Sequence, residues 1–367
     1  MHRKILIVGT NMMNIYHHRL ELIQTLINSN YDVVVAAPKG GEEVGLKKIG
    51  CKFIHTPVDN RGTNIKNDLG LLRNLVKICR KEKPDVILTF YTKTNIYGGL
   101  VARMLKIPYV ENITGLGSSL AGGGKIFKIM SFLYKEAVKS SFIVFFQNQS
   151  NYKFFTEKKL YKGRSKLLPG SGVSLERYVE LPYPKSDTVE FLFISRILKE
   201  KGIEEYLKAA EIIKRKYPKS IFHVVGPCEP QYENIIHKAD SEGIIQYHGK
   251  LYDVKNILNF THCTVLPSYY PEGMANVLLE SAASGRPIIT TKLPGCGETV
   301  ENNVTGFTVE EKNVDALVKA LEKFILLKAE EKEKMGKEGR RKMEKEFDRN
   351  VVTKEYMRII EEIFMNR

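Results

Sequence analysis

The chain has 367 residues, with 57 Lys and Arg against 42 Asp and Glu and a formal charge of +15 at pH 7. Hydrophobic residues make up 43% and charged residues 27%, which is typical of globular proteins and excludes a disordered or fibrous chain. No apolar run approaches the roughly 20 residues of a membrane-spanning helix, and five cysteines without a C-x-x-C pair favour reduced thiols in the cytoplasm over a disulfide framework or a zinc site.

The first half of the chain alternates short apolar runs with helical patterns. Strands are expected at 4–8, 32–37, 53–57, 86–89, 109–112 and 142–147, and helices at 16–28, 69–83, 97–105 and 125–139. Nearly continuous apolar strands that alternate with helices predict a parallel sheet with helices on both faces.

A second series of the same kind follows a Pro- and Gly-marked break at 167–172. Strands are expected at 191–195, 222–226, 244–247, 263–267, 287–291 and 306–309, and helices at 203–216, 232–241, 254–260, 275–284 and 314–327. The tail from 329 onward reads as helical, and 351–365 has an apolar face that should dock on another part of the protein. The sequence therefore predicts two doubly wound α/β domains, 1–168 and 169–348, each with ligand-binding loops at the carboxyl ends of its strands.

The excess of positive over negative charge is confined to the first half. Residues 1–165 contain 26 Lys and Arg against 11 Asp and Glu, whereas the rest of the chain is balanced. This asymmetry favours an anionic partner, such as a phospholipid surface, a phosphorylated lipid or a nucleic acid. The alternative explanation is a genome-wide preference for lysine, which would also raise the positive charge. The segment 125–139 mixes lysines with large apolar residues. It predicts either a helix that lies on an anionic bilayer or a core helix with a solvated lysine face.

The most informative stretch runs from 267 to 280. A strand ends, a loop carries Glu272 and Gly273, a helix is expected to begin near Met274, and Glu280 follows eight residues after Glu272. Backbone N–H groups at 274–276 could meet a diphosphate, and the two carboxylates could accept hydrogen bonds from sugar hydroxyls on either side. The alternative is one surface glutamate at a helix start and another on an exposed helix face.

Further loops with useful chemistry follow other strands. Arg196 and Lys201, which lie next to Gly202, could neutralise a leaving diphosphate; the alternative is a solvated turn. Gly226, the segment 248–251 and the segment 293–299 follow three more strands. Because parallel strands end at one edge of a sheet, these loops should meet at a single ligand site.

As a set, these residues resemble glycosyltransferase family 4, the retaining enzymes of the GT-B fold. The matching motifs are Gly170–Val173 with Tyr178, Ser195-Arg196 with Lys201-Gly202, Pro267-Ser268 with Glu272-Gly273 and Glu280, Gly285–Ile288, Pro294-Gly295 with Glu298, and Asn303 with Gly306-Phe307.

The resemblance implies two Rossmann-like domains that face each other across a cleft, with a C-terminal helix at 349–367 that crosses back to the first domain. It also implies that Arg196 and Lys201 bind the donor diphosphate, that Glu272 contacts the transferred sugar, and that Glu280 contacts the ribose. The expected donor-binding residues are Gly9, Gly249, Lys250, Leu251, Gly273, Met274, Ala275, Asn276 and Glu280.

The first half looks like bacterial enzymes that extend undecaprenyl-diphosphate-linked sugars in capsule, O-antigen or N-glycan precursor assembly. Its matching segments are 14–19, 93–98, 114–117 and 146–148. Many family members have a histidine where this chain has Thr114, so no histidine-dependent step is carried over. Lys93 suits an acceptor phosphate, whereas His17 could equally be a packed or capping residue. The expected acceptor-binding residues are His17, Arg19, Lys93, Asn95 and Thr114.

These observations predict a retaining glycosyltransferase, with Glu272, Arg196 and Lys201 as its catalytic residues. It would transfer an N-acetylhexosamine or a hexose from a UDP-sugar to a polyprenyl-diphosphate-linked saccharide, at the inner face of the cytoplasmic membrane. No Asp-x-Asp motif is present, so neither a metal nor a cofactor is expected. One alternative is a UDP-sugar 2-epimerase, a phosphorylase or another nucleotide-sugar enzyme of the GT-B architecture. Another is a nucleic-acid-binding protein, although no nucleic-acid-binding motif is recognisable.

Overall fold

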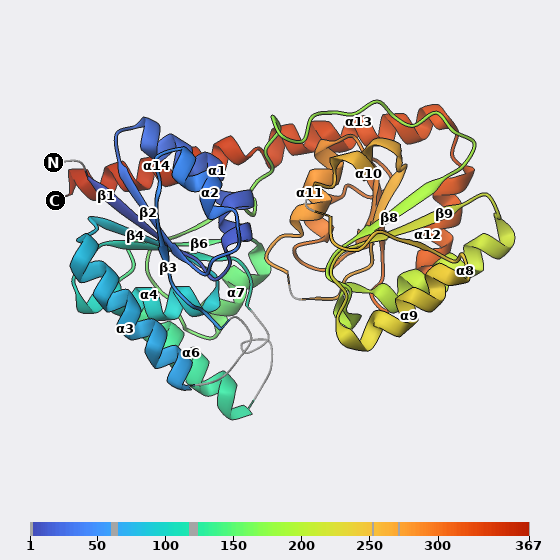
Figure 1. Ribbon diagram of the computed structural model, residues 1–367. Helices are drawn as coiled ribbons and strands as arrows, with labels where there is room; N and C mark the ends of the chain where they lie inside the picture. Colours follow the sequence, from blue (N-terminus) through green and yellow to red (C-terminus); the bar gives the residue numbers. More distant parts are fainter. Residues whose placement is uncertain (1–2, 60–64, 117–123, 252, 271, 367) are drawn as a thin grey trace. The chain divides into compact units, whose positions relative to one another are not determined.

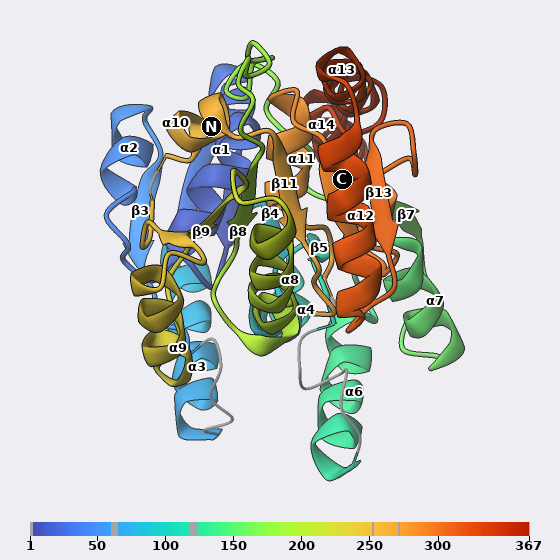
Figure 2. The same ribbon diagram turned by 90° about the vertical axis from the view of Figure 1, so that its right-hand side faces the viewer.

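The computed structural model describes residues 3–59, 65–116, 124–251, 253–270 and 272–366. The chain forms two compact units, Met1–Gly172 together with Arg349–Arg367, and Val173–Asp348. Each unit contains one parallel sheet covered by helices on both faces, as the sequence predicts (Figures 1 and 2).

The first unit is built on a sheet of order β3-β2-β1-β4-β5-β6-β7. All neighbouring strands are parallel, and the central strands are almost completely buried. The strands are β1 (Lys4–Val8), β2 (Asp32–Ala37), β3 (Lys52–His55), β4 (Val86–Phe90), β5 (Tyr109–Ile113), β6 (Ile143–Phe146) and β7 (Ser165–Leu167).

Helices from both ends of the chain cover one face of this sheet. These are α1 (Met12–Asn28), α2 (Glu43–Lys48) and α14 (Arg349–Met365). The other face is covered by α3 (Ile65–Glu82), α4 (Thr92–Met104), α6 (Gly124–Val138) and α7 (Gln149–Glu157). The side chain of Asn11 caps the start of α1 by accepting a hydrogen bond from the Asn14 N–H at 3.1 Å.

The last helix, α14, is held in the first unit by buried polar contacts. Arg349 is 4% exposed and donates hydrogen bonds to the carbonyls of Gly172 and His17 and to both carboxylate oxygens of Glu21. The hydroxyl of Tyr356 accepts a hydrogen bond from Asn112 at 2.7 Å. The final helix therefore completes the core of the unit that the first residues of the chain begin.

The second unit has a sheet of order β10-β9-β8-β11-β12-β13. Its strands are β8 (Glu190–Ile194), β9 (Ile221–Val225), β10 (Gln246–Tyr247), β11 (Cys263–Leu266), β12 (Ile288–Thr291) and β13 (Gly306–Val309). One face carries α8 (Ile203–Lys216), α9 (Pro230–Ser241) and α12 (Val314–Leu326), and the other carries α10 (Lys255–Phe260), α11 (Asn276–Ala283) and α13 (Ala329–Glu346).

Among the described residues, the sequence did not predict α2, α7, β7 or the two short 3-10 helices Lys199–Lys201 and Gly297–Thr299. The helical tail is divided into α13 and α14, with Phe347 and Asp348 between them. Within the described part of the chain, no helix has the length and hydropathy that a membrane span requires. All five cysteines are described, and none forms a disulfide.

Candidate functional site

The candidate donor residues of the second unit lie at the carboxyl edge of its sheet. From β8 the chain runs outward through β9 and β10, and it then returns to β11 on the other side of β8 and continues outward through β12 and β13. Open α/β sheets bind ligands at such a point, because the loops that leave the two adjacent strands diverge there. Arg196 and Lys201 follow β8, and Glu272 follows β11, so the three predicted catalytic residues flank this point.

A tight turn after β8 presents Arg196 and Lys201. Lys199–Lys201 form a short 3-10 helix that ends at Gly202, whose φ is +80°. A Cβ on Gly202 would lie 2.3 Å from the carbonyl oxygen of Pro267, so only glycine fits between this turn and the loop after β11. The side chain of Arg196 is 40% exposed and lies 3.9 Å from the carboxylate of Glu229.

The side chain of Lys201 is 12% exposed, and its ammonium forms an ion pair with the carboxylate of Glu272. The ammonium also lies 4.9 Å from the centre of the Tyr270 ring, within the range of a cation–π contact. Burial, together with the nearby Arg196 cation, lowers the pKa of Lys201 to about 8. Lys201 is therefore still mostly protonated at neutral pH, but it titrates far closer to neutrality than an exposed lysine.

The loop that carries Glu272 is fixed by contacts with its neighbours. The Tyr269 N–H donates to the Glu200 carbonyl at 2.8 Å, and the Thr291 hydroxyl donates to the Ser268 carbonyl at 2.6 Å. A Cβ on Gly295 would lie 2.7 Å from the Cβ of Glu272, so the loop after β12 packs directly behind the carboxylate.

Helix α11 starts later than expected. It begins at Asn276, and the Ala275 N–H donates to the Gly295 carbonyl at 2.8 Å, so this amide is already engaged. The interval from Glu272 to Glu280 is consequently part loop and part helix, because Glu272 precedes the first turn. Among the described residues, the buried Oδ1 of Asn276 has no hydrogen-bond partner.

The loop after β10 is anchored by a chain of hydrogen bonds that the sequence did not reveal. Gly249 accepts a hydrogen bond from the Gly226 N–H at 2.8 Å. His223 is 2% exposed, and its ring nitrogens lie 3.0 Å from His248 Nε2 and 2.8 Å from a carboxylate oxygen of Glu190. Glu190 lies in β8, His223 in β9, and His248 directly after β10. Their proximity can be recognised only from the order of these strands in the sheet. Lys250 is exposed, and Leu251 is half-buried.

Two of the predicted acceptor residues are inside the first unit. Arg19 is 2% exposed and lies 4.3 Å from the centre of the Phe90 ring, and burial lowers its pKa. Asn95 is fully buried and donates to the Asn112 carbonyl at 2.9 Å and to the Tyr134 hydroxyl at 3.2 Å. Both side chains are buried in this structure, and their direct contact with an acceptor stays a prediction from the sequence.

The other expected residues of the first unit are partly accessible. Lys93 forms a 2.8 Å ion pair with Asp68, and the two side chains are 13% and 18% exposed. His17 is half-buried at the start of α1, and Thr114 is half-buried directly after β5. Gly9 follows β1, and a Cβ there would lie 2.5 Å from Ile15. Gly117, at the end of the matching segment 114–117, lies outside the described residues.

Sequence analysis also missed a buried acid on β5. Glu111 is fully buried, and neither carboxyl oxygen has a hydrogen-bond partner among the described residues. Burial raises the pKa of Glu111 well above its ordinary value. It occupies space that Gly99 of α4 leaves open, since a Cβ on Gly99 would lie 2.3 Å from Oε1 of Glu111.

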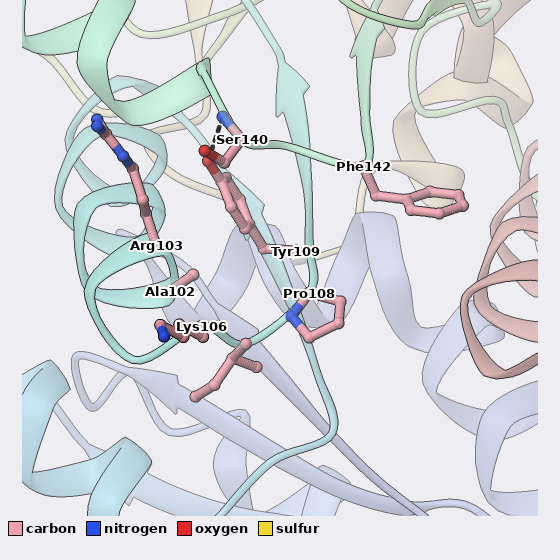
Figure 3. Close-up of a pocket in the computed structure, with 8 residues that line it drawn as sticks. Ala102, Arg103, Lys106, Pro108, Tyr109, Ser140 and Phe142 are labelled. Carbon is pink, nitrogen blue, oxygen red and sulfur yellow. Dashed lines mark hydrogen bonds between the residues drawn. The ribbon is translucent and has the colours of Figure 1, made fainter. Parts of the chain in front are cut away.

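A pocket of about 380 Å³ lies elsewhere in the first unit (Figure 3). The pocket lies at the amino edge of the sheet, where β5 and β6 begin. Its lining residues are Ala102, Arg103, Lys106, Ile107, Pro108, Tyr109, Ser140 and Phe142. Ser140 donates its N–H to the Tyr109 hydroxyl at 3.2 Å within it. Because the candidate residues follow the carboxyl ends of the strands, this pocket is separate from them. In the described ranges, no group of three His, Cys, Asp or Glu side chains could hold a metal ion.

Comparison with known proteins gives consistent matches for both units. Residues 182–342 match the family model "Glycosyl transferases group 1", and residues 4–148 match "Glycosyl transferase 4-like".

Two curated relatives match over most of their length. The chain is 26% identical over 372 aligned positions to N,N'-diacetylbacillosaminyl-diphospho-undecaprenol alpha-1,3-N-acetylgalactosaminyltransferase of Campylobacter jejuni, covering 96% of this chain and 97% of that protein. It is 24% identical over 343 positions to UDP-Gal:alpha-D-GlcNAc-diphosphoundecaprenol alpha-1,3-galactosyltransferase of Escherichia coli, covering 87% and 88%. Among solved structures, a glycosyltransferase from Rickettsia africae matches with a TM-score of 0.81 and 19% identity over the whole of both chains, which shows a shared fold.

The packing of Gly202 against Pro267 predicts a difference between two glycine substitutions. We expect Gly202→Ala to lower the free energy of unfolding of the second unit by about 2–3 kcal/mol, because the left-handed backbone and the Pro267 carbonyl both oppose a Cβ. The matched control is Gly243→Ala, with φ of +69° and no atom within 4 Å of the added Cβ, where we expect about 1 kcal/mol. Urea unfolding followed by far-ultraviolet circular dichroism measures both, and equal losses would contradict a contact at Gly202.

Proposed function

We propose that this chain, which belongs to the group 1 glycosyltransferases, transfers a sugar from a UDP-sugar to a polyprenyl-diphosphate-linked saccharide. The transferase class and the GT-B fold that the sequence predicts are confirmed by the family models and the solved structure. The family match also favours transfer over the epimerase alternative. The observation that carries the proposal is the gathering of Arg196, Lys201 and Glu272 where β8 and β11 diverge.

The donor is proposed to bind to the second unit. The relative from Escherichia coli is named for a UDP-sugar donor, and two cations at one turn suit a diphosphate. Arg196 and Lys201 would hold its phosphates, Gly249–Leu251 the base, Glu280 the ribose and Glu272 the transferred sugar. Gly273–Asn276 would line the phosphate and sugar, and the Oδ1 of Asn276, which has no hydrogen-bond partner within the described ranges, would be available to a hydroxyl. Gly9, in the first unit, stays a prediction from the sequence.

The proposed reaction proceeds with retention of configuration. The bond between the anomeric carbon and the phosphate oxygen of UDP breaks, and the acceptor hydroxyl oxygen forms a bond to that carbon on the same face. The departing phosphate oxygen takes the proton of that hydroxyl, so no protein base is needed. Arg196 and Lys201 stabilise the negative charge that develops on UDP, a contribution that is commonly the largest single one in such sites.

The acceptor is proposed to bind to the first unit. Both curated relatives are named for diphospho-undecaprenol-linked acceptors. His17, Lys93 and Thr114 are the proposed contacts, since each is partly accessible. Arg19 and Asn95 are proposed to support them from within the core, because both are buried.

A lipid-linked acceptor also suggests contact with a membrane, and α6 has a suitable surface. Ile129 is 59% exposed and Phe132 is 63% exposed, while Lys128 and Lys135 on the same helix are also exposed. Apolar side chains flanked by lysines bind the interface of an anionic bilayer. We therefore place the enzyme at the inner face of the cytoplasmic membrane, held there by α6.

The proposed reaction predicts that UDP is released only when a UDP-sugar and a polyprenyl-diphosphate-linked saccharide are both present, with EDTA in place of added metal. Arg196→Ala should lower kcat/KM by about 10²–10³-fold, because it removes a positive charge that stabilises the negative charge developing on UDP. Its thermal unfolding should stay unchanged. The control is Lys199→Ala, which removes a 62% exposed cation from the same turn and should change kcat/KM less than twofold. Acceptor-independent UDP release, or formation of an epimeric UDP-sugar, would contradict the proposal.

The pKa of Lys201 predicts a pH dependence of UDP binding. Only the protonated amine attracts the diphosphate, so affinity should be constant below pH 8 and fall by up to tenfold per pH unit as the amine deprotonates above about 8. UDP itself is fully ionised there, since its last phosphate pKa is about 6. Lys201→Arg stays charged throughout this range and should give a flat profile. Calorimetry between pH 7 and 9.5 measures the UDP affinity of the wild type and of Lys201→Arg. Parallel pH profiles of the two proteins would argue against Lys201 as a ligand of the diphosphate.

The proposed membrane contact predicts a loss of vesicle binding for Phe132→Ser. We expect its partitioning onto phosphatidylglycerol vesicles to fall about tenfold, since burial of a phenylalanine side chain is worth about 1.5–3 kcal/mol. Val44→Ser is the control, because Val44 is 56% exposed on α2, on the other face of the same sheet. Co-sedimentation measures binding. Equal binding of the wild type to phosphatidylcholine vesicles, or equal losses in the two variants, would remove α6 as the contact.

A further inference from the structure

Two residues with different proposed tasks contact each other in this structure. Lys201 is proposed to hold a phosphate and Glu272 to hold the transferred sugar, yet the ammonium and the carboxylate form an ion pair. Their side chains are only 12% and 14% exposed, so water screens the pair less than it screens an exposed one. Any diphosphate that takes the Lys201 ammonium must therefore compete with the carboxylate already bound to it.

We propose that the Lys201–Glu272 ion pair makes the donor site discriminate between UDP-sugar and UDP, favouring the substrate over the product. The inference rests on the proposed function. UDP alone removes Lys201 from Glu272, so the carboxylate loses a cation at the same time as two phosphates come close to it. A UDP-sugar brings hydroxyl groups that donate to Glu272, so the transferred sugar replaces the lost cation. After transfer the sugar is gone, the pair forms again, and UDP is held less tightly.

The surroundings of both side chains favour return to the pair. The 3-10 turn and Gly202 fix the backbone of Lys201, and the Tyr270 ring lies 4.9 Å from its ammonium. On the other side, the loop after β12 packs against the Cβ of Glu272 at Gly295. Because the backbone at Lys201 and the Cβ of Glu272 are both held in place, the two charges meet again once a phosphate leaves. Glu272 thereby acquires a role in product release in addition to its contact with the sugar.

The test is the affinity for UDP of Glu272→Gln, measured by calorimetry at low ionic strength. We expect this variant to bind UDP about five- to tenfold more tightly than the wild type, although it turns over more slowly, because the amide no longer competes for Lys201. Its preference for UDP-sugar over UDP should fall by the same factor. Glu272→Ala should show the same direction, which covers the case in which the amide misfolds the loop.

Two controls separate the ion pair from a general change of charge. Glu200→Gln removes a negative charge from the residue beside Lys201, at an exposed side chain, and should change UDP affinity less than twofold. Lys201→Ala should bind UDP weakly. Adding Glu272→Gln to this variant should not raise its affinity for UDP, because the ammonium for which the carboxylate and the phosphate compete is gone. Circular dichroism checks that each variant is folded.

The outcomes distinguish the inference from the function beneath it. Wild-type binding of UDP with equal or weaker binding by Glu272→Gln and Glu272→Ala would overturn the inference and leave the proposed donor site standing. Equal tightening in Glu200→Gln, or in the Lys201→Ala background, would also overturn it, since the effect would then be one of net charge. Absence of UDP binding by the wild type would overturn both.

Discussion

Backbone contact between the turn after β8 and the loop after β11 holds the candidate donor residues in place. Glu200 accepts hydrogen bonds from the Tyr269 N–H and the Ser268 hydroxyl, and Gly202 lies directly against the Pro267 carbonyl. Main-chain atoms make most of these contacts, so the separation of the two loops depends on few side chains, namely the Ser268 hydroxyl and the absence of a side chain at Gly202. The charged groups therefore sit on a fixed frame, and their exchange of partners requires little backbone movement. Preorganisation of this kind allows electrostatic stabilisation without reorganisation during the reaction.

Much of this arrangement could be predicted from the sequence, because buried parallel strands leave a clear apolar signal and their carboxyl ends then locate the loops. The start of α11 could not, because the partner of the Ala275 N–H is a carbonyl on the loop after β12. The Glu190–His223–His248 chain depends on the order of β8, β9 and β10. Similarly, β7 is a three-residue edge strand with two polar residues, which is too short for a periodic pattern.

Burial in the first unit could not be predicted from the sequence, for a physical reason. Arg19 lies within α1 and Asn95 in the first turn of α4, and both are polar residues of a kind that commonly faces a ligand. Here Arg19 lies against the Phe90 ring, and Asn95 bonds to a backbone carbonyl and the Tyr134 hydroxyl. Their partners come from other elements, so no local pattern shows that they are covered. Lys93 is likewise engaged by a residue of another element, since it pairs with Asp68 of α3.

The contact between Gly99 and Glu111 links two positions on different elements. Glu111 fits only because α4 has no side chain at position 99, and a Cβ there would overlap Oε1. In evolutionary terms, the two positions are expected to covary. A homologue with a larger residue at the first should have a small apolar residue at the second, and the larger residue would then fill the space that the acid occupies here.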